Sequence, residues 1–488
     1  MTSKRWLLIN PPTGKYIRET RCQAPVKGVL ATALRPPLDL AYIAACISIF
    51  GCECRITDYP AEGKVWDDFL SDIIAYEPDY VVVNTTTFTL KKDLLTCEIV
   101  KKTNPNIVTL AKGAIFYASQ NDILENNPEL DIAVIDDDEA GFGDIASGKP
   151  LSEVPGIIYR EEGKICRNIK RKPINLDELP APRRDLLKNE LYIRPDNGKM
   201  QTTILVGRGC DSNCTYCVAT LVGGHKVRYR SVESVINEVK DCIRNYHFRD
   251  FYFLADNFTS DKQWVTNFCK RILELDVRIN WLCNSRIDCI DEDRLILMKK
   301  SGCWGISMGV ESGSQYILDK IGKGISLERV RKSVLLCKKH KMVCLLHFMI
   351  GFPWDNYNTI NASIKFARSL RWGIIEFNIL IPLPGTLIEK IIKNLGLMQP
   401  ETMFESADYS IPLARTIELG RDELMRLRRK AFIRVYSNPL LLIHSLRLFK
   451  SFKHFYYCFV ILVKKLFWII GTRLNKKTGD NSNESCSG

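Results

Sequence analysis

Residues 206–217 read Val206-Gly-Arg-Gly-Cys-Asp-Ser-Asn-Cys-Thr-Tyr-Cys217, which places Cys210, Cys214 and Cys217 on one short loop at C-x3-C-x2-C spacing. The loop directly follows residues 201–206, Gln-Thr-Thr-Ile-Leu-Val, a composition that predicts a β-strand. A [4Fe-4S] cluster normally takes four cysteine thiolates. Three thiolates on one loop therefore predict a cluster with one iron open to an exogenous ligand, which permits chemistry as well as electron transfer.

Two simpler roles for these cysteines have less support. The chain has 18 cysteines, and most of them are expected to be small buried hydrophobic side chains. A structural zinc site would need a fourth Cys or His close by, and the next candidate, His225, lies eight residues beyond Cys217. We therefore favour the iron–sulfur cluster.

The cysteine spacing, the aromatic Tyr216 and the preceding Gly207-Arg-Gly209 resemble the cluster loop of the radical S-adenosylmethionine (SAM) superfamily. The resemblance implies that the open iron binds the amino and carboxylate groups of SAM. It also implies a reductant such as flavodoxin or ferredoxin, whose electron cleaves SAM to methionine and a 5'-deoxyadenosyl radical.

The formal net charge of +13 is concentrated at one end of the chain. Residues 421–488 hold 14 Lys and Arg against four Asp and Glu, so an excess of ten lies in the final 68 residues. The remaining chain is close to neutral, which argues against a broad nucleic-acid-binding surface. We expect no nucleic-acid partner.

The cysteines and the first residues both point to the cytoplasm. The cysteines are too irregularly spaced for a disulfide framework, so we expect thiols in a reducing compartment. The apolar run at residues 6–9 is too short for a signal peptide. Both features predict a cytoplasmic protein.

Residues 1–150 alternate β-rich runs with amphipathic segments at 38–50 and 66–76, which predicts a doubly wound, Rossmann-like α/β domain. Such domains bind ligands at the carboxyl ends of their parallel strands. The expected strands are 5–10, 54–58, 80–84, 107–110 and 131–135.

This domain is similar to the cobalamin-binding domain of one large subgroup of radical SAM enzymes. The likeness rests on Asn10-Pro-Pro12, on residues 35–45 and on an Asp after the second strand. Two departures are the missing D-x-H-x-x-G signature and Asp136-Asp-Asp-Glu139 in place of Gly-Glu-x-Glu. The domain therefore serves either to bind cobalamin or only as a scaffold or substrate lid. The cobalamin residues that the resemblance implies are Asn10, Asp58, Thr85, Thr86, Lys112, Gly113 and Glu139.

A hairpin at 154–164 and a proline-punctuated linker at 175–184 make residues 151–195 a connecting segment. From 196 to 395 the β/α alternation resumes and predicts a partial (β/α)6 barrel that works at the carboxyl ends of its strands. The expected strands are 202–206, 250–255, 279–283, 305–310, 343–350 and 376–381.

Residues just after these strands are the candidates for binding SAM. Arg286 could pair with the SAM carboxylate in a fork geometry, or form a structural ion pair with Asp288. Glu311 could accept hydrogen bonds from ribose hydroxyls. The SAM residues that the resemblance implies are Asp256, Asn284, Arg286, Glu311, Ser312, Gly351 and Pro384.

We name no catalytic acid or base, because the cofactors carry out the bond making in this chemistry. His347 lies within an expected barrel strand and either faces the cavity or is a satisfied core histidine. The second role is the more common one.

Residues 396–488 are expected to be helical, basic and amphipathic, with a disordered end. The apolar run at 455–470 is broken by Lys464 and Lys465, so it is too short to span a bilayer. It would lie on the inner face of the membrane as an interfacial helix, or pack on the barrel. We leave both possibilities open.

The resemblance covers residues 5–395 and implies cobalamin-dependent methylation of an unactivated carbon. The substrate is then a small molecule or a lipid such as an isoprenoid. Other members of the subgroup form rings, remove carboxyl groups or catalyse other oxidations and reductions. An RNA-modifying methylthiotransferase and a non-enzymatic iron–sulfur electron carrier or sensor are the rival hypotheses.

Overall fold

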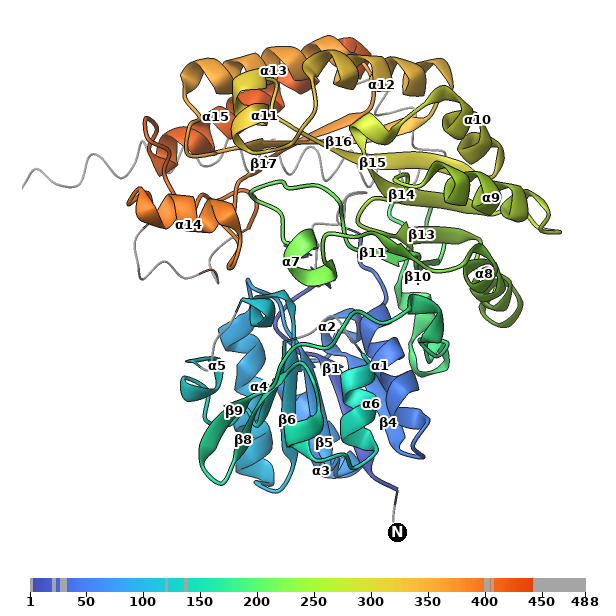
Figure 1. Ribbon diagram of the computed structural model, residues 1–488, viewed down its shortest axis with the longest axis vertical. Helices are drawn as coiled ribbons and strands as arrows, with labels where there is room; N and C mark the ends of the chain where they lie inside the picture. Colours follow the sequence, from blue (N-terminus) through green and yellow to red (C-terminus); the bar gives the residue numbers. More distant parts are fainter. Residues whose placement is uncertain are drawn as a thin grey trace, which may run out of the picture.

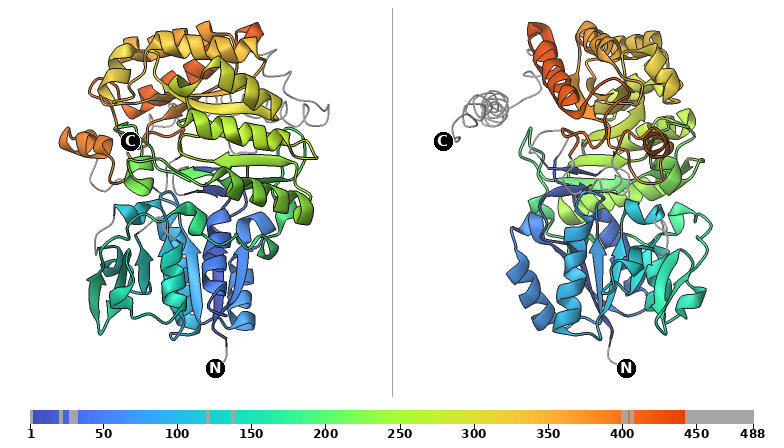
Figure 2. Two further views of the ribbon diagram at one scale, coloured as in Figure 1. Left: turned by 45° about the vertical axis from the view of Figure 1, so that its right-hand side comes forward. Right: turned by 90° about the vertical axis from the view of Figure 1, so that its left-hand side faces the viewer.

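The protein consists of two α/β bodies, each built on its own parallel sheet (Figure 1). The computed structural model describes residues 3–19, 23–26, 33–118, 122–135, 139–398, 404 and 408–441. The two bodies remain stacked one on the other when the molecule is turned (Figure 2).

The N-terminal sheet has seven strands in the order β4-β1-β5-β6-β7-β8-β9. The first five are parallel, as expected for a doubly wound domain. The chain passes from β1 to β4 on one side and then returns to β5 on the other, so the strand order reverses between β1 and β5. A ligand site is expected at this reversal, beyond the carboxyl ends of the two strands. The strands are β1 Arg5–Asn10, β4 Glu53–Asp58, β5 Tyr80–Asn84, β6 Val108–Lys112, β7 Ile132–Val134, β8 Ile157–Glu161 and β9 Lys164–Arg167.

Both faces of this sheet are covered by helices because alternate side chains of each central strand point to opposite faces. Trp6 and Leu8 pack with α1 (Leu38–Ser48) and α6 (Ala140–Ala146). Leu7 and Ile9 pack on the other face with α3 (Trp66–Tyr76) and α4 (Leu90–Thr103). The continuous apolar run in the sequence is thus explained by burial on both sides.

The predicted hairpin is present as β8 and β9. It pairs antiparallel with β7 and so extends the N-terminal sheet beyond its parallel part.

The second sheet has six parallel strands in sequential order, which confirms the predicted partial barrel. Strands β10 and β13 are buried along most of their length, whereas partly exposed side chains recur along the inner face of β14 to β17. The strands are β10 Gln201–Leu205, β13 Asp250–Leu254, β14 Asn280–Arg286, β15 Cys303–Glu311, β16 Val343–Ile350 and β17 Ile374–Ile379. The helices are α8 Val232–Tyr246, α9 Lys262–Leu273, α10 Glu292–Lys300, α11 Gln315–Lys320, α12 Leu327–Lys339, α13 Tyr357–Leu370 and α14 Leu387–Asn394.

The last strand of the barrel is covered by α15 (Arg421–Tyr436). The Tyr436 hydroxyl donates to the carbonyl of Ile375 at 2.9 Å and accepts from its N–H at 3.2 Å. Arg428 Nε donates to the carbonyl of Phe377 at 2.8 Å. These contacts satisfy backbone groups that an open edge strand would present to other chains.

The predicted surface helix at 455–470 lies outside the described residues, which end at residue 441. In the part of the chain that the structure describes, no helix is both long and apolar enough to cross a bilayer.

A buried charge network joins the two bodies. Arg184, in the segment that connects them, donates to Glu238 Oε1 on α8 at 2.6 Å, and Arg230 donates to the other oxygen. Tyr42 of α1 lies 3.4 Å from the same carboxylate. Burial alone would raise the pKa of Glu238, but the two guanidinium groups outweigh it and hold the pKa below its usual value. The network fixes how the N-terminal sheet meets the barrel.

Replacing Glu238 with alanine should therefore destabilise the protein strongly. The change leaves two buried guanidinium groups without their carboxylate, which costs about 3–5 kcal/mol. The free energy of unfolding can be measured by urea denaturation under anaerobic conditions. Glu233→Ala is the matched control on the same helix, because Glu233 pairs with Arg271 at the surface, where such pairs contribute about 0–1 kcal/mol. Equal losses in the two variants would contradict the assigned role of Glu238.

Candidate functional site

The loop that carries the three cysteines is held by close backbone contacts. It runs from β11 (Gly207–Arg208) to α7 (Ala219–Gly223). Gly209 has a φ of +91°, and a Cβ there would overlap the carbonyl oxygen of Lys226 and lie 2.8 Å from that of Gly223. The Gly209 N–H donates to Asp256 Oδ2 at 2.7 Å. Asp256 therefore anchors the start of the loop.

Two of the three cysteines have polar partners. Arg286 Nη1 lies 3.8 Å from Cys214 Sγ, and the Ala219 N–H donates to Cys217 Sγ at 3.4 Å. One sulfur thus lies near a guanidinium group and another accepts a backbone N–H. Among the described residues, no three His, Cys, Asp or Glu side chains converge to hold a single metal ion. Three thiol donors on one loop fit an iron–sulfur cluster, whose protein ligands are cysteine thiolates.

Beside this loop, Glu311 and Lys323 form a buried pair that is contacted by the loop residue Tyr216. Lys323 Nζ donates to Glu311 Oε1 at 2.8 Å and lies 3.2 Å from the Tyr216 hydroxyl. Burial alone would lower the pKa of Lys323, but Glu311 outweighs it and the pKa is raised. Burial also raises the pKa of Tyr216, so that its hydroxyl stays protonated. This pair therefore places a cation and an anion next to the cysteines.

Arg286 makes the ion pair that was one of its two predicted roles. Its Nε and Nη2 atoms contact the two carboxylate oxygens of Asp288 at 3.0 and 2.9 Å. Nη2 also donates to the carbonyl of Lys323 at 2.8 Å. The guanidinium group is thus fixed between the cysteine loop and the Glu311–Lys323 pair.

Glu311 lies at a backbone irregularity. The pairing of β15 with β16 shifts between Gly309 and Glu311, and Glu311 has a φ of +70°. Positive φ at a non-glycine residue costs energy and is concentrated at functional sites. A Cβ at Gly309 would overlap the Glu311 carboxylate and lie 3.0 Å from Lys323 Nζ. The glycine leaves the room that this carboxylate occupies.

The other predicted SAM residues lie around the ends of the strands. Gly351 follows β16 with a φ of +101°, and its N–H donates to Asp355 Oδ2 at 3.0 Å. Burial raises the pKa of Asp355 to about 6. Ser312 is buried and contacts Ser363 Oγ on α13 at 3.1 Å.

The remaining two predicted SAM residues, Asn284 and Pro384, make other contacts. The Asn284 carbonyl accepts from the Phe258 N–H at 3.0 Å. Pro384 lines a small cavity with residues that include Thr87, Ala114 and Val218.

A larger pocket lies between the two bodies, with about 920 Å³ of empty space that is partly open to solvent. Its walls include the carboxyl ends of β1 and β5, where the strand order reverses, together with β10 and α7 of the barrel. Asn84 Nδ2 donates to Asn10 Oδ1 at 2.9 Å at this reversal. The pocket therefore brings the ligand edge of the N-terminal sheet next to the cysteine loop.

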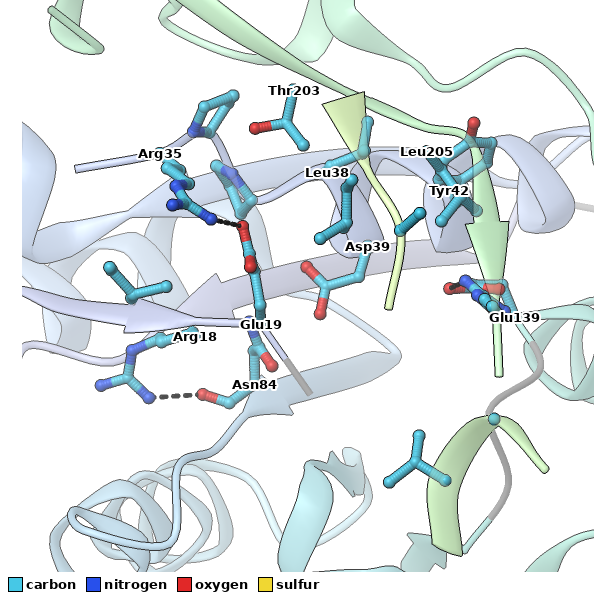
Figure 3. Close-up of a pocket in the computed structure, with 18 of the residues that line it drawn as sticks. Arg18, Glu19, Arg35, Leu38, Asp39, Tyr42, Asn84, Glu139, Thr203 and Leu205 are labelled. Atoms are coloured by element: carbon cyan, nitrogen blue, oxygen red, sulfur yellow. Dashed lines mark hydrogen bonds and ion pairs between the residues drawn. The ribbon is translucent and has the colours of Figure 1, made fainter. Parts of the chain in front are cut away.

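Charged side chains from both bodies line this pocket in pairs (Figure 3). Arg35 donates to Glu19 Oε1 at 2.6 Å. Arg208, on the cysteine loop, donates to Glu139 Oε1 at 2.7 Å and so crosses between the bodies. Burial alone would raise the pKa of Glu139, but Arg208 outweighs it and the pKa is lowered. Asp39, also in the wall, pairs with Lys112 at 2.5 Å.

Each of two carboxylates in this wall has one oxygen without a hydrogen-bond partner in the described part of the chain. Within the described residues, Oε2 of Glu19 and Oε2 of Glu139 are buried and have no hydrogen-bond partner. Such atoms are costly unless a donor reaches them. The corrin ring of cobalamin carries carboxamide N–H donors at its rim. The pocket chemistry therefore fits cobalamin.

The structure divides the predicted cobalamin residues into two groups. Asn10 and Glu139 line the pocket, together with Asp256 from the predicted SAM set. The other five do not appear among the described residues of its wall, namely Asp58, Thr85, Thr86, Lys112 and Gly113. These residues support the strand ends in other ways.

The contacts of the second group are mostly internal to the N-terminal body. Asp58 accepts from the Tyr192 hydroxyl at 3.0 Å, and Thr85 Oγ1 donates to the carbonyl of Lys112 at 2.9 Å. Thr86 contacts Thr89 Oγ1 at 2.7 Å. A Cβ at Gly113 would lie 2.8 Å from the carbonyl oxygen of Thr85. Asp136, the residue in place of the expected glycine, lies outside the described residues.

Several residues of the site were not predicted. Arg208 and Asp39 lie within stretches that carry the family resemblance, so their positions were signalled but their pairing was not. Lys323 lies in a helix-to-helix connection, and Arg18 and Glu19 lie at the end of the short strand β2 (Tyr16–Arg18). No periodic or motif signal marks these three.

The comparisons with known proteins agree with this geometry. Residues 204–367 match the radical SAM superfamily and residues 29–146 match the B12 binding domain. An uncharacterized methyltransferase of Pyrococcus horikoshii is 30% identical over 448 residues, which are 90% of this chain and 94% of that protein. The anaerobic magnesium-protoporphyrin IX monomethyl ester cyclase of Rubrivivax gelatinosus is 24% identical over 420 residues, 83% of this chain and 75% of the cyclase.

A solved structure shares the two-body fold. The cobalamin-dependent SAM radical enzyme OxsB, solved with aqua-cobalamin and SAM bound, superposes with a TM-score of 0.71 at 17% identity. The match covers 97% of this chain and 71% of OxsB. Together with the sequence matches, it confirms the predicted order of folds, with the cobalamin-binding type of domain first and the radical SAM barrel second. The chain belongs to the radical SAM superfamily, in the group whose members carry an N-terminal B12-binding domain, and this membership implies a [4Fe-4S] cluster, SAM and cobalamin as its cofactors.

Proposed function

We propose that this enzyme transfers a methyl group from SAM, by way of cobalamin, to a carbon atom of a small-molecule substrate. The observation that carries the proposal is the pocket that the ligand edge of the N-terminal sheet shares with the cysteine loop. The likeness to the Pyrococcus horikoshii methyltransferase supports the same reaction class. When bound, the cluster and SAM supply a radical and cobalamin supplies the methyl group.

On the barrel side, this chain's residues would hold charged groups in fixed positions. Cys210, Cys214 and Cys217 would bind three irons, and the Arg286 guanidinium lies beside Cys214. Arg286 is also the candidate partner of the SAM carboxylate. Glu311 would accept hydrogen bonds from ribose hydroxyls while Lys323 balances its charge.

On the other side of the pocket, Asn10, Glu19 and Glu139 would orient the corrin through its carboxamide groups. The free oxygens of Glu19 and Glu139 are the acceptors. Arg208 neutralises Glu139 and joins it to the cysteine loop. The same ion pair therefore relates the positions of the two cofactors.

Ring formation is the second candidate, because the cyclase of Rubrivivax gelatinosus matches 83% of this chain. It differs from methylation in its product, which gains no carbon from SAM. A lipid substrate and contact with the inner face of the membrane stay predictions, since their basis at residues 455–470 lies outside the described residues. A flavodoxin- or ferredoxin-like reductant is proposed on the family's chemistry.

Replacing Glu139 with glutamine should weaken cobalamin binding. The variant keeps the shape of the side chain but gives up a charged acceptor, a loss that corresponds to about tenfold or more in affinity. Anaerobic titration with hydroxocobalamin, followed by visible absorbance, measures the Kd. Glu161→Gln is the control, because Glu161 is an exposed residue at the end of β8. An unchanged Kd for Glu139→Gln would remove this residue from the cobalamin site.

Methyl transfer is tested with SAM whose methyl group carries deuterium. The reconstituted enzyme, cobalamin, a reductant and labelled SAM are incubated with a metabolite extract of the producing cells. We expect a product that gains the intact labelled methyl group, together with 5'-deoxyadenosine. The Cys210/Cys214/Cys217→Ala variant should lose iron and form neither, whereas Cys166→Ala should form both. Conversion of a metabolite without the label would favour ring formation instead.

A further inference from the structure

The inner face of the barrel carries a polar chain that the cofactors do not account for. Ser307, His347 and Glu376 lie on the neighbouring strands β15, β16 and β17. His347 Nε2 lies 2.8 Å from Ser307 Oγ, and its Nδ1 lies 3.5 Å from Glu376 Oε2. The side chains of His347 and Glu376 keep 27% and 30% of their exposure. The chain therefore faces accessible space inside the barrel.

The Ser307–His347–Glu376 group lies close to the proposed SAM residue Glu311 along β15 and β16. His347 is paired in register with Gly309, whose neighbour Glu311 carries the contact with Lys323. The Glu311 carboxylate occupies the space that a Gly309 side chain would fill, and the Glu311–Lys323 ion pair is close enough to act on the charge of the imidazole. A substrate that reaches the SAM residues along the inner face would pass this chain.

The charges around His347 favour its protonated form. Burial alone would lower the pKa of His347, but Glu376 and, more weakly, Glu311 outweigh it, and Lys323 opposes them. On the far side of Glu376, Arg428 of α15 contributes a positive charge. The net direction is a pKa above the usual value for histidine. The His347 ring therefore stays protonated up to a higher pH than a histidine in water does.

The protonation state of His347 decides whether the Ser307 hydroxyl can donate a hydrogen bond to a ligand. In the imidazolium form both ring nitrogens donate, with Nδ1 directed to Glu376 and Nε2 to Ser307 Oγ. The serine hydroxyl must then turn its own proton toward another acceptor. After loss of a proton, Nε2 accepts from Ser307 and the hydroxyl proton is no longer available. Ser307 thus donates into the barrel only below the pKa of His347.

We propose that Ser307, held by His347 and Glu376, binds an oxygen acceptor of the substrate, such as a carboxylate, carbonyl or phosphate oxygen. The proposal deepens the proposed function and rests on it for the reaction. It assigns the substrate a polar oxygen near the reacting carbon and excludes a wholly hydrocarbon substrate segment at this place. A hydrocarbon there would leave the serine donor unsatisfied, which is costly.

The substrate role is tested by the labelled methyl transfer described above, with Ser307→Ala and His347→Gln. We expect the amount of methylated product formed per 5'-deoxyadenosine to fall about tenfold or more in both variants. His340→Gln is the matched control, because His340 contacts Glu292 at 2.7 Å outside the barrel. If Ser307→Ala and His347→Gln keep the wild-type ratio, the substrate role is wrong.

A pH profile separates substrate binding from a merely structural chain. In the wild type the ratio of product to 5'-deoxyadenosine should fall as the pH rises through the pKa of His347. In Glu376→Gln this fall should begin at lower pH, because the carboxylate no longer supports the imidazolium. A profile that stays the same in Glu376→Gln would overturn the proposal.

A second measurement does not depend on methyl transfer. The six histidines can be labelled with ¹³C at Cε1 in the full reconstituted protein, and His347→Gln assigns the His347 resonance. We expect His347 to titrate above the usual histidine pKa, and lower in Glu376→Gln. If the wild type transferred no labelled methyl group, the proposed function would be wrong. The titration would still show whether Ser307, His347 and Glu376 are coupled. Equal His347 titration in both proteins would disprove the Ser307–His347–Glu376 coupling.

Discussion

The carboxylate of Glu238 lies buried between the guanidinium groups of Arg184 and Arg230, and the geometry of the site depends on this contact. Arg184 belongs to the connecting segment, Glu238 to the barrel, and Tyr42 reaches the carboxylate from the N-terminal body. A buried ion pair adds little net stability but is costly to break, so it favours one arrangement.

That arrangement places the carboxyl ends of β1 and β5 against β10 and the cysteine loop. Each body alone would offer an incomplete site. The N-terminal body supplies Asn10 and Asn84 at its strand reversal and the carboxylates of Glu19, Asp39 and Glu139, and the barrel supplies Arg208 and Asp256. The ion pair between Glu139 and Arg208 joins the two walls.

Much of the fold could be predicted from the sequence because its strands are buried on both faces or alternate regularly. The apolar run at residues 6–9 and the three valines of β5 each produced a clear pattern. The cysteine loop was also identified, since its three thiols, its aromatic residue and its glycines are adjacent in sequence. Strand ends were predicted less exactly, as β17 shows, because turn residues shift the first and last hydrogen bonds.

The pocket could not be predicted, because its wall combines residues that are far apart in the sequence. Glu139 meets Arg208 only after both bodies have formed and docked. Thr85 and Thr86 follow the correct strand but bond within their own body, so a position at a strand end does not ensure a place in the pocket. Lys323 gave no signal because a single lysine between two helices is ordinary. These contacts are decided by tertiary packing.

The central claim is that cobalamin binds in this pocket, next to the cysteine loop that would hold the cluster. Electron paramagnetic resonance tests it most directly, because cob(II)alamin and the reduced [4Fe-4S] cluster each carry an unpaired electron. In the reconstituted protein with both groups reduced, the account predicts that the two signals broaden or split each other. Two signals that simply add, each identical to the signal of protein with only one of the groups, would contradict it.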